Sequence, residues 1–364
     1  DEKLVDAQTL DLRFEDVRAL GSLQYDIESG LQSADIVELV LNEGDRASVS
    51  MAPIEGGYSV KVIGEQLDLK PMLKRFLGLG EGASNQATSN VEDQIIDIRV
   101  DLDRALGFYK TTAYDLSSHI VFKGADFTRV DLQTSLGNTN VASIATNPVP
   151  NGRLMSAATN DLGTLLRFIG LYSRLLNGEA SLALTIDTKD KRNSGEFKLT
   201  DFSLVDEDKV AQVLGNHRDS RELIERGNRV NFREAHLKFS RQGEVITVEE
   251  SSLDGGTIGG TLRGAIYTNS RQYDLVGTYI PLFGLNNIFQ KLPLLGRILG
   301  GRDGEGLIGV TFAIRGELDN PQFAINPASI LAPGVFRQLF EFRAQRGDEA
   351  AKKALEAVDA GQTN

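Results

Sequence analysis

Apolar and polar residues alternate along most of the chain, and this pattern constrains the fold more than any other feature. It begins with Leu10, Leu12 and Phe14. Because successive side chains of a strand point to opposite faces, each such segment predicts a strand with one apolar and one solvated face. The alternation returns at these positions: Leu23, Tyr25 and Ile27; Val49 and Met51; Tyr58, Val60 and Val62; Ile96, Ile98, Val100 and Leu102; Ile120 and Phe122; Val130, Leu132 and Leu136; Leu237 and Phe239; Phe323 and Ile325.

Only a few segments have helical spacing. The strongest runs from Asn160 to Gly178, with Asn160 or Asp161 as N-cap and Gly178 as the stop. Shorter helices are predicted near 71–78, within 206–227 and at 334–343. Because no helix of about 10–15 residues follows each strand, a doubly wound parallel sheet is disfavoured. The pattern predicts a meander-like, mainly antiparallel β protein with inserted helices.

The predicted boundary lies where periodicity is lost. Residues 78–90 are rich in Gly, Ser and Asn and are interpreted as a loop. We therefore expect an N-terminal β segment over 1–77, a loop and boundary over 78–95, a second β region over 96–343 and a charged tail over 344–364. Within the second region, a hairpin is predicted around the turn that follows Ile186.

Composition excludes several classes of function. The chain of 364 residues has no cysteine, which excludes disulfides and thiolate metal sites or nucleophiles. Its formal net charge of −12 argues against a general nucleic-acid surface. No run reaches the ~18 uninterrupted apolar residues of a membrane-spanning helix. The chain begins at Asp1 without a signal peptide, and we expect it to be a mature or excised fragment of a longer protein.

No candidate catalytic motif lies in the sequence context that its chemistry requires. The three histidines, His119, His217 and His236, are far apart in sequence. The glycines of GEGLIG, beginning at Gly304, match a dinucleotide fingerprint but lead into a strand instead of a helix. The acidic loop 187–196 places lysines where a calcium loop needs ligands. We therefore predict no enzyme activity, no cofactor and no metal site.

The alternation itself allows two interpretations. Apolar strand faces most often pack into the core of a closed sandwich. The chain has few aromatic residues, 7%, and no tryptophan, and small aliphatic side chains would also suit an open groove filled by acyl chains. The residues alone leave both interpretations open.

Residues 280–343 differ from the rest of the chain. They contain five of the nine prolines, and no acidic residue occurs between Asp274 and Asp303. Prolines can stop a sheet from pairing at its edge, and basic residues beside apolar ones suit a membrane surface. Contacts with a membrane or partner are predicted for Phe283, Ile288, Phe289, Lys291, Leu294, Leu295, Arg297, Ile298, Phe336 and Phe340. The alternative is that this stretch plugs the last rung of a groove.

Several segments resemble the AsmA-like family, most closely the C-terminal region of its YhdP-type branch. They are NDLGTLLRFIGLY at 160–172, GEFKLTDFSLVD at 195–206, and PLLGRILGG, GELDNP and NPASILAPG within 293–334. The resemblance covers roughly residues 95 to 343. Members of this family are similar to bridge-like lipid-transfer proteins, whose long β-sheet forms an apolar groove across the periplasm of Gram-negative bacteria.

The resemblance implies a mainly β fold: an elongated, curled antiparallel sheet that forms an open apolar groove, with a few short helices and a C-terminal amphipathic helix. It implies non-enzymatic transport of phospholipid toward the outer membrane, in a periplasmic protein anchored to the inner membrane by a preceding segment. The expected partners are phospholipid, the outer-membrane surface and an envelope protein, without nucleic acid. The alternative function is a structural or assembly module with a closed β core.

Groove-lining positions are predicted on the strands from 182 onward. They are Leu182, Leu184, Ile186, Phe197, Leu199, Val230, Phe232, Val310, Phe312 and Ile314.

Overall fold

The computed structural model describes residues 4–14, 17–76, 94–124, 126–137, 139–205, 229–255, 258–281, 310–317 and 320–326. The chain divides into two compact units. Unit 1 comprises Asp1–Ala183 with Phe202–Val205, and unit 2 comprises Leu184–Asp201 with Asp206–Asn364.

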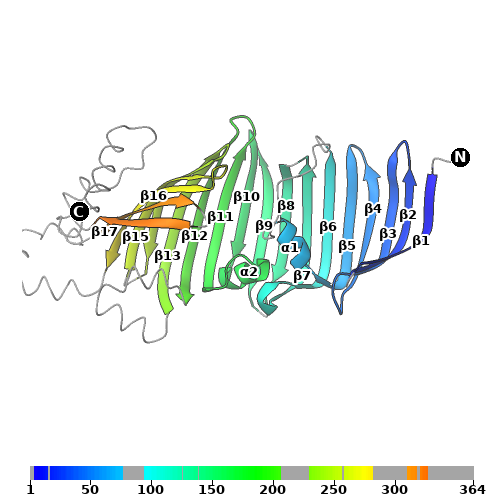
Figure 1. Ribbon diagram of the computed structural model, residues 1–364, viewed down its shortest axis with the longest axis horizontal. Coiled ribbons are helices and arrows are strands. Elements are labelled where there is room, and N and C mark those ends of the chain that lie inside the picture. The colour runs from blue at the N-terminus through cyan, green and yellow to red at the C-terminus, as the bar shows by residue number, and fades with distance from the viewer. Residues whose placement is uncertain are drawn as a thin grey trace, which may run out of the picture. The chain divides into compact units, whose positions relative to one another are not determined.

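Unit 1 is built around ten strands that lie side by side in chain order (Figure 1). Each pairs with the next, and every pair except β5–β6 is antiparallel. The strands are β1 (Leu4–Phe14), β2 (Val17–Asp26), β3 (Gly30–Val40), β4 (Arg46–Ile54), β5 (Gly57–Asp68), β6 (Ile95–Leu106), β7 (Thr112–Lys123), β8 (Asp126–Ser135), β9 (Val141–Val149) and β10 (Gly152–Thr159).

The pair β5–β6 is parallel, in register from Gly57↔Ile95 to Asp68↔Leu106. A parallel pair needs a crossover long enough to return the chain to the starting end of the sheet. The helix α1 (Lys70–Phe76) lies in that connection. Thus the helix predicted near 71–78 is confirmed, and the strands on both sides of the predicted boundary are neighbours in one sheet.

The long helix predicted over 160–178 is wrong in its second half. Helix α2 (Leu162–Ile169) is capped by Asp161 and ends at Gly170, whose φ of 80° is left-handed. Gly170 is adapted to this position because a left-handed residue closes the helix by bonding its amide to carbonyls of the last turn. Leu175 already belongs to a strand. Likewise Ile27, predicted in a strand, lies in the turn after β2 and is 63% exposed.

Two long strands, β11 (Leu175–Asp187) and β12 (Arg192–Val205), contribute residues to both units and form the predicted hairpin arms. In unit 2, each strand from β13 onward pairs antiparallel with the next. These strands are β13 (Arg229–Gln242), β14 (Val245–Asp254), β15 (Ile258–Tyr267), β16 (Gln272–Pro281), β17 (Val310–Glu317) and β18 (Asn320–Asn326). The prediction of a mainly antiparallel β protein with few helices is confirmed.

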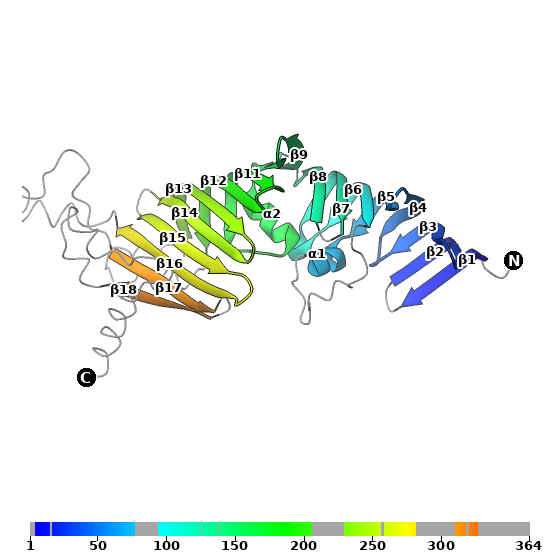
Figure 2. The ribbon, with the colours of Figure 1, turned by 90° about the horizontal axis from the view of Figure 1, so that it is seen from above.

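A compact core occupies one end of the unit 1 sheet. Leu67, Leu102, Ala105 and Ala113 are at most 3% exposed, and Phe168 of α2 packs into the same cluster. Leu73 of α1 and Leu165 and Ile169 of α2 cover it. Figure 2 shows both helices on the same side of the sheet. The helices therefore bury one end of one sheet face, and no other described element packs over the rest of that face.

Candidate binding face

Register turns the alternation of the sequence into continuous apolar rows. One row crosses ten strands, and its only members without an apolar side chain are Gly21 and Ser118. The row reads, from β1 to β10, Leu10, Gly21, Ile36, Val49, Val62, Val100, Ser118, Leu132, Ile144 and Ala157. At roughly 4.8 Å between strands, it extends over about 40 Å.

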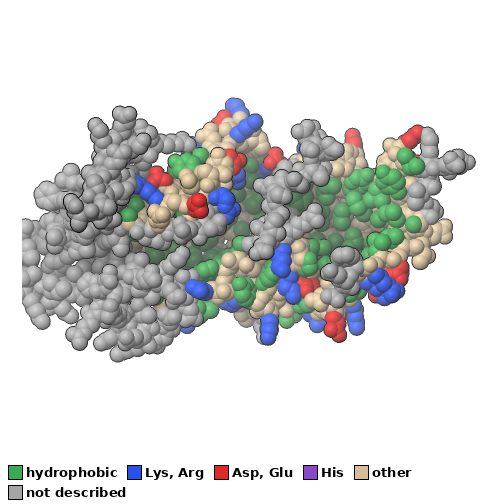
Figure 3. Space-filling view, viewed as in Figure 1, with side chains coloured by type: hydrophobic (Ala, Val, Ile, Leu, Met, Phe, Trp, Pro, Cys, Tyr) green, Lys and Arg blue, Asp and Glu red, His purple; other side chains and the backbone are tan. Residues whose placement is uncertain are grey.

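A second row lies on the side away from the helices, two residues from the first on every strand except β1, where a register shift makes the separation three. It crosses eight strands and contains Ala7, Leu23, Ala34, Met51, Val60, Ile98, Ile120 and Val130. All eight side chains are partly exposed. In Figure 3 hydrophobic side chains form a continuous green surface over the N-terminal strands of this face. We call the surface formed by these two rows the apolar face of unit 1.

The opposite face of the same sheet is polar. Between the two apolar rows in register lies a row of Ser22, Asp35, Ser50, Lys61, Arg99, His119 and Asp131. The Nε2 atom of His119 lies 3.1 Å from Oδ1 of Asp97, and Nε of Arg99 lies 3.5 Å from the same oxygen. The charged side chains around Asp97 therefore pair with one another on the polar face, whereas the two rows of the apolar face consist mainly of alkyl side chains.

A buried carboxylate pair fixes α1 against the end of the sheet. Asp45 accepts hydrogen bonds from the amides of Leu41, Asn42 and Asp68 at 2.9–3.0 Å. Burial raises the pKa of Asp45, and these bonds offset it only in part. Burial also acts to raise the pKa of Asp68, but hydrogen bonds from Asn42 and Lys70 outweigh it and lower that pKa below its ordinary value.

Asp161 likewise fixes the start of α2. Its carboxylate accepts from the Thr164 amide at 2.9 Å, the Thr164 hydroxyl at 2.7 Å and Nδ2 of Asn140 at 2.8 Å. At both helices, an Asn from an earlier strand connection donates a hydrogen bond to the Asp that precedes the helix. Asn42 donates to Asp68, and Asn140 donates to Asp161. Each helix is thereby fixed over the same end of the apolar face.

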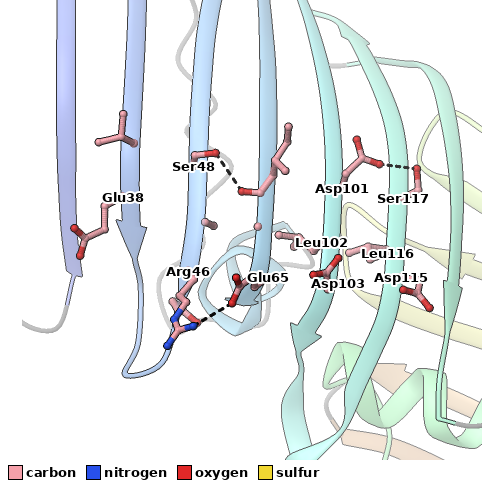
Figure 4. Close-up of a pocket in the computed structure, with 15 residues that line it drawn as sticks. Glu38, Arg46, Ser48, Glu65, Asp101, Leu102, Asp103, Asp115, Leu116 and Ser117 are labelled. Carbon is pink, nitrogen blue, oxygen red and sulfur yellow. Dashed lines mark hydrogen bonds and ion pairs between the residues drawn. The ribbon is translucent and has the colours of Figure 1, made fainter.

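An open hollow of about 840 Å³ lies in unit 1, and six of its fifteen lining residues are Asp or Glu. Figure 4 shows the residues that line it. Glu65, Asp103 and Asp115 come from neighbouring strands, and Glu65 pairs with Arg46 at 3.1 Å. Oδ1 of Asp101 accepts a hydrogen bond from Ser117 at 3.0 Å. Among the residues described, no three His, Cys, Asp or Glu side chains are close enough to hold a metal ion. The hollow therefore lacks the ligand set of a metal centre.

Unit 2 repeats the division into two faces. A row of Phe239, Val248, Gly264, Leu275, Ile314 and Phe323 crosses six strands. Its neighbour contains Thr247, Ala265, Asp274, Arg315 and Gln322, with Arg315 and Asp274 paired at 3.2 Å. On the polar side of β13, Nε2 of His236 lies 2.7 Å from Oε1 of Glu196, and this hydrogen bond lowers the pKa of Glu196.

The predicted groove residues all lie in strands. Phe312 and Ile314 occupy β17, and Ile314 belongs to the apolar row of unit 2. A Cβ built on Gly195 would lie 2.4 Å from Cζ of Phe239, so Phe197 and Leu199 share the side of β12 that faces this row. The remaining positions are Leu182, Leu184 and Ile186 in β11, Val230 and Phe232 in β13, and Val310 in β17, whose side chain lies outside the described set.

The groove positions differ in exposure. Leu199 and Phe232 are each only 5% exposed, whereas Leu182, Leu184 and Ile186 are partly exposed. The residues predicted to contact a membrane or partner, within 283–298 and at Phe336 and Phe340, lie outside the described residues. The same holds for the GEGLIG glycines, for 206–227 and for the predicted terminal helix.

The groove positions predicted from the sequence include none on β1 to β10, although the alternation of these strands is as clear as that of later strands. Val60, Ile98 and Ile120 have the signal, but only pairing shows that they lie side by side.

Comparison of the chain with protein-family models, with curated proteins and with solved structures found no match. None of the helices described is both long and apolar enough to span a membrane. The geometry of the two faces is therefore the basis on which function is inferred.

Proposed function

We propose that this protein is a non-enzymatic phospholipid carrier that holds acyl chains on the apolar face of its sheet. The observation that carries the proposal is the pair of apolar rows across unit 1, partly exposed and backed by a polar face in the same strands. Each methylene that an acyl chain buries contributes about 0.8 kcal/mol. A continuous apolar row lets a chain pass from strand to strand while it stays in contact with apolar side chains.

The resemblance to the AsmA-like family extends the proposal to a cellular setting. On that basis the protein works in the periplasm of a Gram-negative bacterium and passes phospholipid toward the outer membrane. Residues 280–343 would be the end that meets a membrane or an envelope protein. The acidic overall charge and the paired charges of the polar face are compatible with a solvated outer surface.

Adjacent residues of β6 offer a sharp test. Ile98 belongs to the apolar face and Arg99 to the polar row. A photoreactive benzoylphenylalanine is placed at each position in turn, and the protein is illuminated with phosphatidylglycerol that bears an alkyne on one acyl chain. We expect a lipid adduct at position 98 and little or none at position 99, detected by intact-protein mass spectrometry.

Two results would overturn the proposal. Equal labelling at both positions would mean nonspecific contact with lipid, and no labelling at either would mean that lipid does not occupy the face. In that second case, crosslinks from position 98 to a protein in whole cells would favour the structural or assembly module instead.

A further inference from the structure

One basic side chain stands on the apolar side of β10. Arg153 is the second residue of that strand and pairs with Pro148. Met155 and Ala157 follow at intervals of two with no register shift, so all three side chains share a face. Ala157 ends the longer apolar row of unit 1. Because β10 leads into α2, Arg153 lies at the rim of the sheet opposite that helix.

The guanidinium of Arg153 has no partner among the residues that the structure describes. Its Nε atom is buried and has no hydrogen-bond acceptor, and no described residue forms an ion pair with it. On the polar face, by contrast, Arg99 lies 3.5 Å from Asp97, and Arg129 lies 2.5 Å from Asp131. Partial burial of an uncompensated charge costs free energy that a bound anion would recover.

From this placement we infer that Arg153 binds the phosphate of a phospholipid whose acyl chains lie along the apolar rows, an inference that rests on the proposed function. A guanidinium presents parallel N–H donors that match the oxygens of a phosphate. Arg153 and Ala157 are four residues apart, about 13 Å along the strand. One lipid can therefore place its head group at the rim and its chains across the row.

The test compares lipids that differ only at the head group. Dioleoyl phosphatidylglycerol, dioleoylglycerol and free oleate are titrated into the full-length wild-type protein, R153Q, R153K and R99Q, with displacement of a fluorescent acyl probe as the readout. We expect R153Q to bind phosphatidylglycerol roughly tenfold more weakly and dioleoylglycerol equally well, because one charge-assisted contact is lost. R153K keeps the charge and should lie between, and R99Q should match the wild type.

Each alternative result has a separate meaning. If the wild type binds phosphatidylglycerol and dioleoylglycerol, and R153Q binds both as the wild type does or loses both equally, the Arg153 assignment fails while the proposed function stands. A loss confined to oleate would assign Arg153 to a carboxylate and overturn the phosphate assignment. If the wild type binds none of the three lipids, the proposed function itself fails.

The stability of the lipid-free protein separates a ligand role from a structural one. Because no described residue pairs with this guanidinium in the lipid-free protein, R153Q should unfold at the same denaturant concentration as the wild type or a higher one. A clear fall in that midpoint for both R153Q and R153K would show that the side chain supports the fold and would overturn the inference.

Discussion

At the scale of single residues, the buried carboxylates at the helix ends show how strongly local chemistry fixes this fold. Asp161 offers its two oxygens to three donors, one of which comes from a different strand connection. Such an aspartate satisfies helix amides that would otherwise lack partners and joins the helix to the sheet. The sequence predicted a cap at Asn160 or Asp161, and the structure shows that Asp161 is the cap, but the sequence gave no sign that Asn140 would reach it.

Replacing Asp161 with alanine should destabilise the protein by about 2 kcal/mol, because the cap and a buried acceptor are both lost. Urea unfolding followed by circular dichroism measures the change. Asp103→Ala serves as the control, because Asp103 is exposed on the sheet and belongs to no core cluster. A D161A variant as stable as D103A would show that the cap contributes little.

Asp68 should make the free energy of unfolding depend on pH in the acidic range. Its folded-state pKa is lower than the ordinary 3.8, so its carboxylate stabilises the fold at and above that pH. The contribution is lost as pH falls below 3.8 through the folded pKa. Asp45, whose pKa is raised by burial, acts in the opposite sense. In D68N the free energy of unfolding should therefore fall less steeply below about pH 4. An unchanged slope would contradict this assignment.

At the scale of elements, strand β6 contributes both to the packed core and to the exposed part of the apolar face. Ile98 and Leu102 lie on the same side of this strand, four residues apart. Leu102 is 3% exposed in the core cluster beneath the helices, whereas Ile98 is partly exposed and outside that cluster. Aliphatic side chains on one side of the same strand are thus buried in the core at one end and open to the surface at the other.

Charged substitutions should separate the two roles. L102D should cost at least 4 kcal/mol or prevent folding, because it buries an unpaired carboxylate. I98D should cost about 1 kcal/mol and yet abolish binding of phosphatidylglycerol, since the charge lies on the apolar face. Denaturant midpoints and lipid titrations measure both. If I98D unfolds as readily as L102D, the face is part of a packed core.

The elements were predicted unequally well. The strands of the hairpin around Ile186 and the short helix near 71–78 followed from periodicity and turn residues. The helix predicted after Asn160 is too long, because Leu175 and Leu176 continue the helical spacing by coincidence. Gly170 ends the helix through its left-handed backbone, and the following leucines enter β11.

At the scale of the whole molecule, two compact units each place an apolar row against a polar one. If the apolar surface is a lipid site, binding must stabilise the folded state by mass action. Phosphatidylglycerol at about 100 times its dissociation constant should add about 2.7 kcal/mol and raise the melting temperature. Dioleoylglycerol should act likewise, and I98D should not respond. No shift in the wild type at saturating lipid would contradict the proposal.

Sequence alone determined which side of each strand is apolar, because the two-residue period of a strand is a local property of the backbone. It also excluded thiol chemistry and offered no catalytic constellation. Tertiary structure decided what local periodicity cannot express. It showed that β5 and β6 run parallel and that both helices cover the same end of one face. It also placed Arg153 at the far rim of that face, where no described side chain pairs with it. Pairing and register join residues distant in sequence, and only they convert alternating strands into a continuous surface.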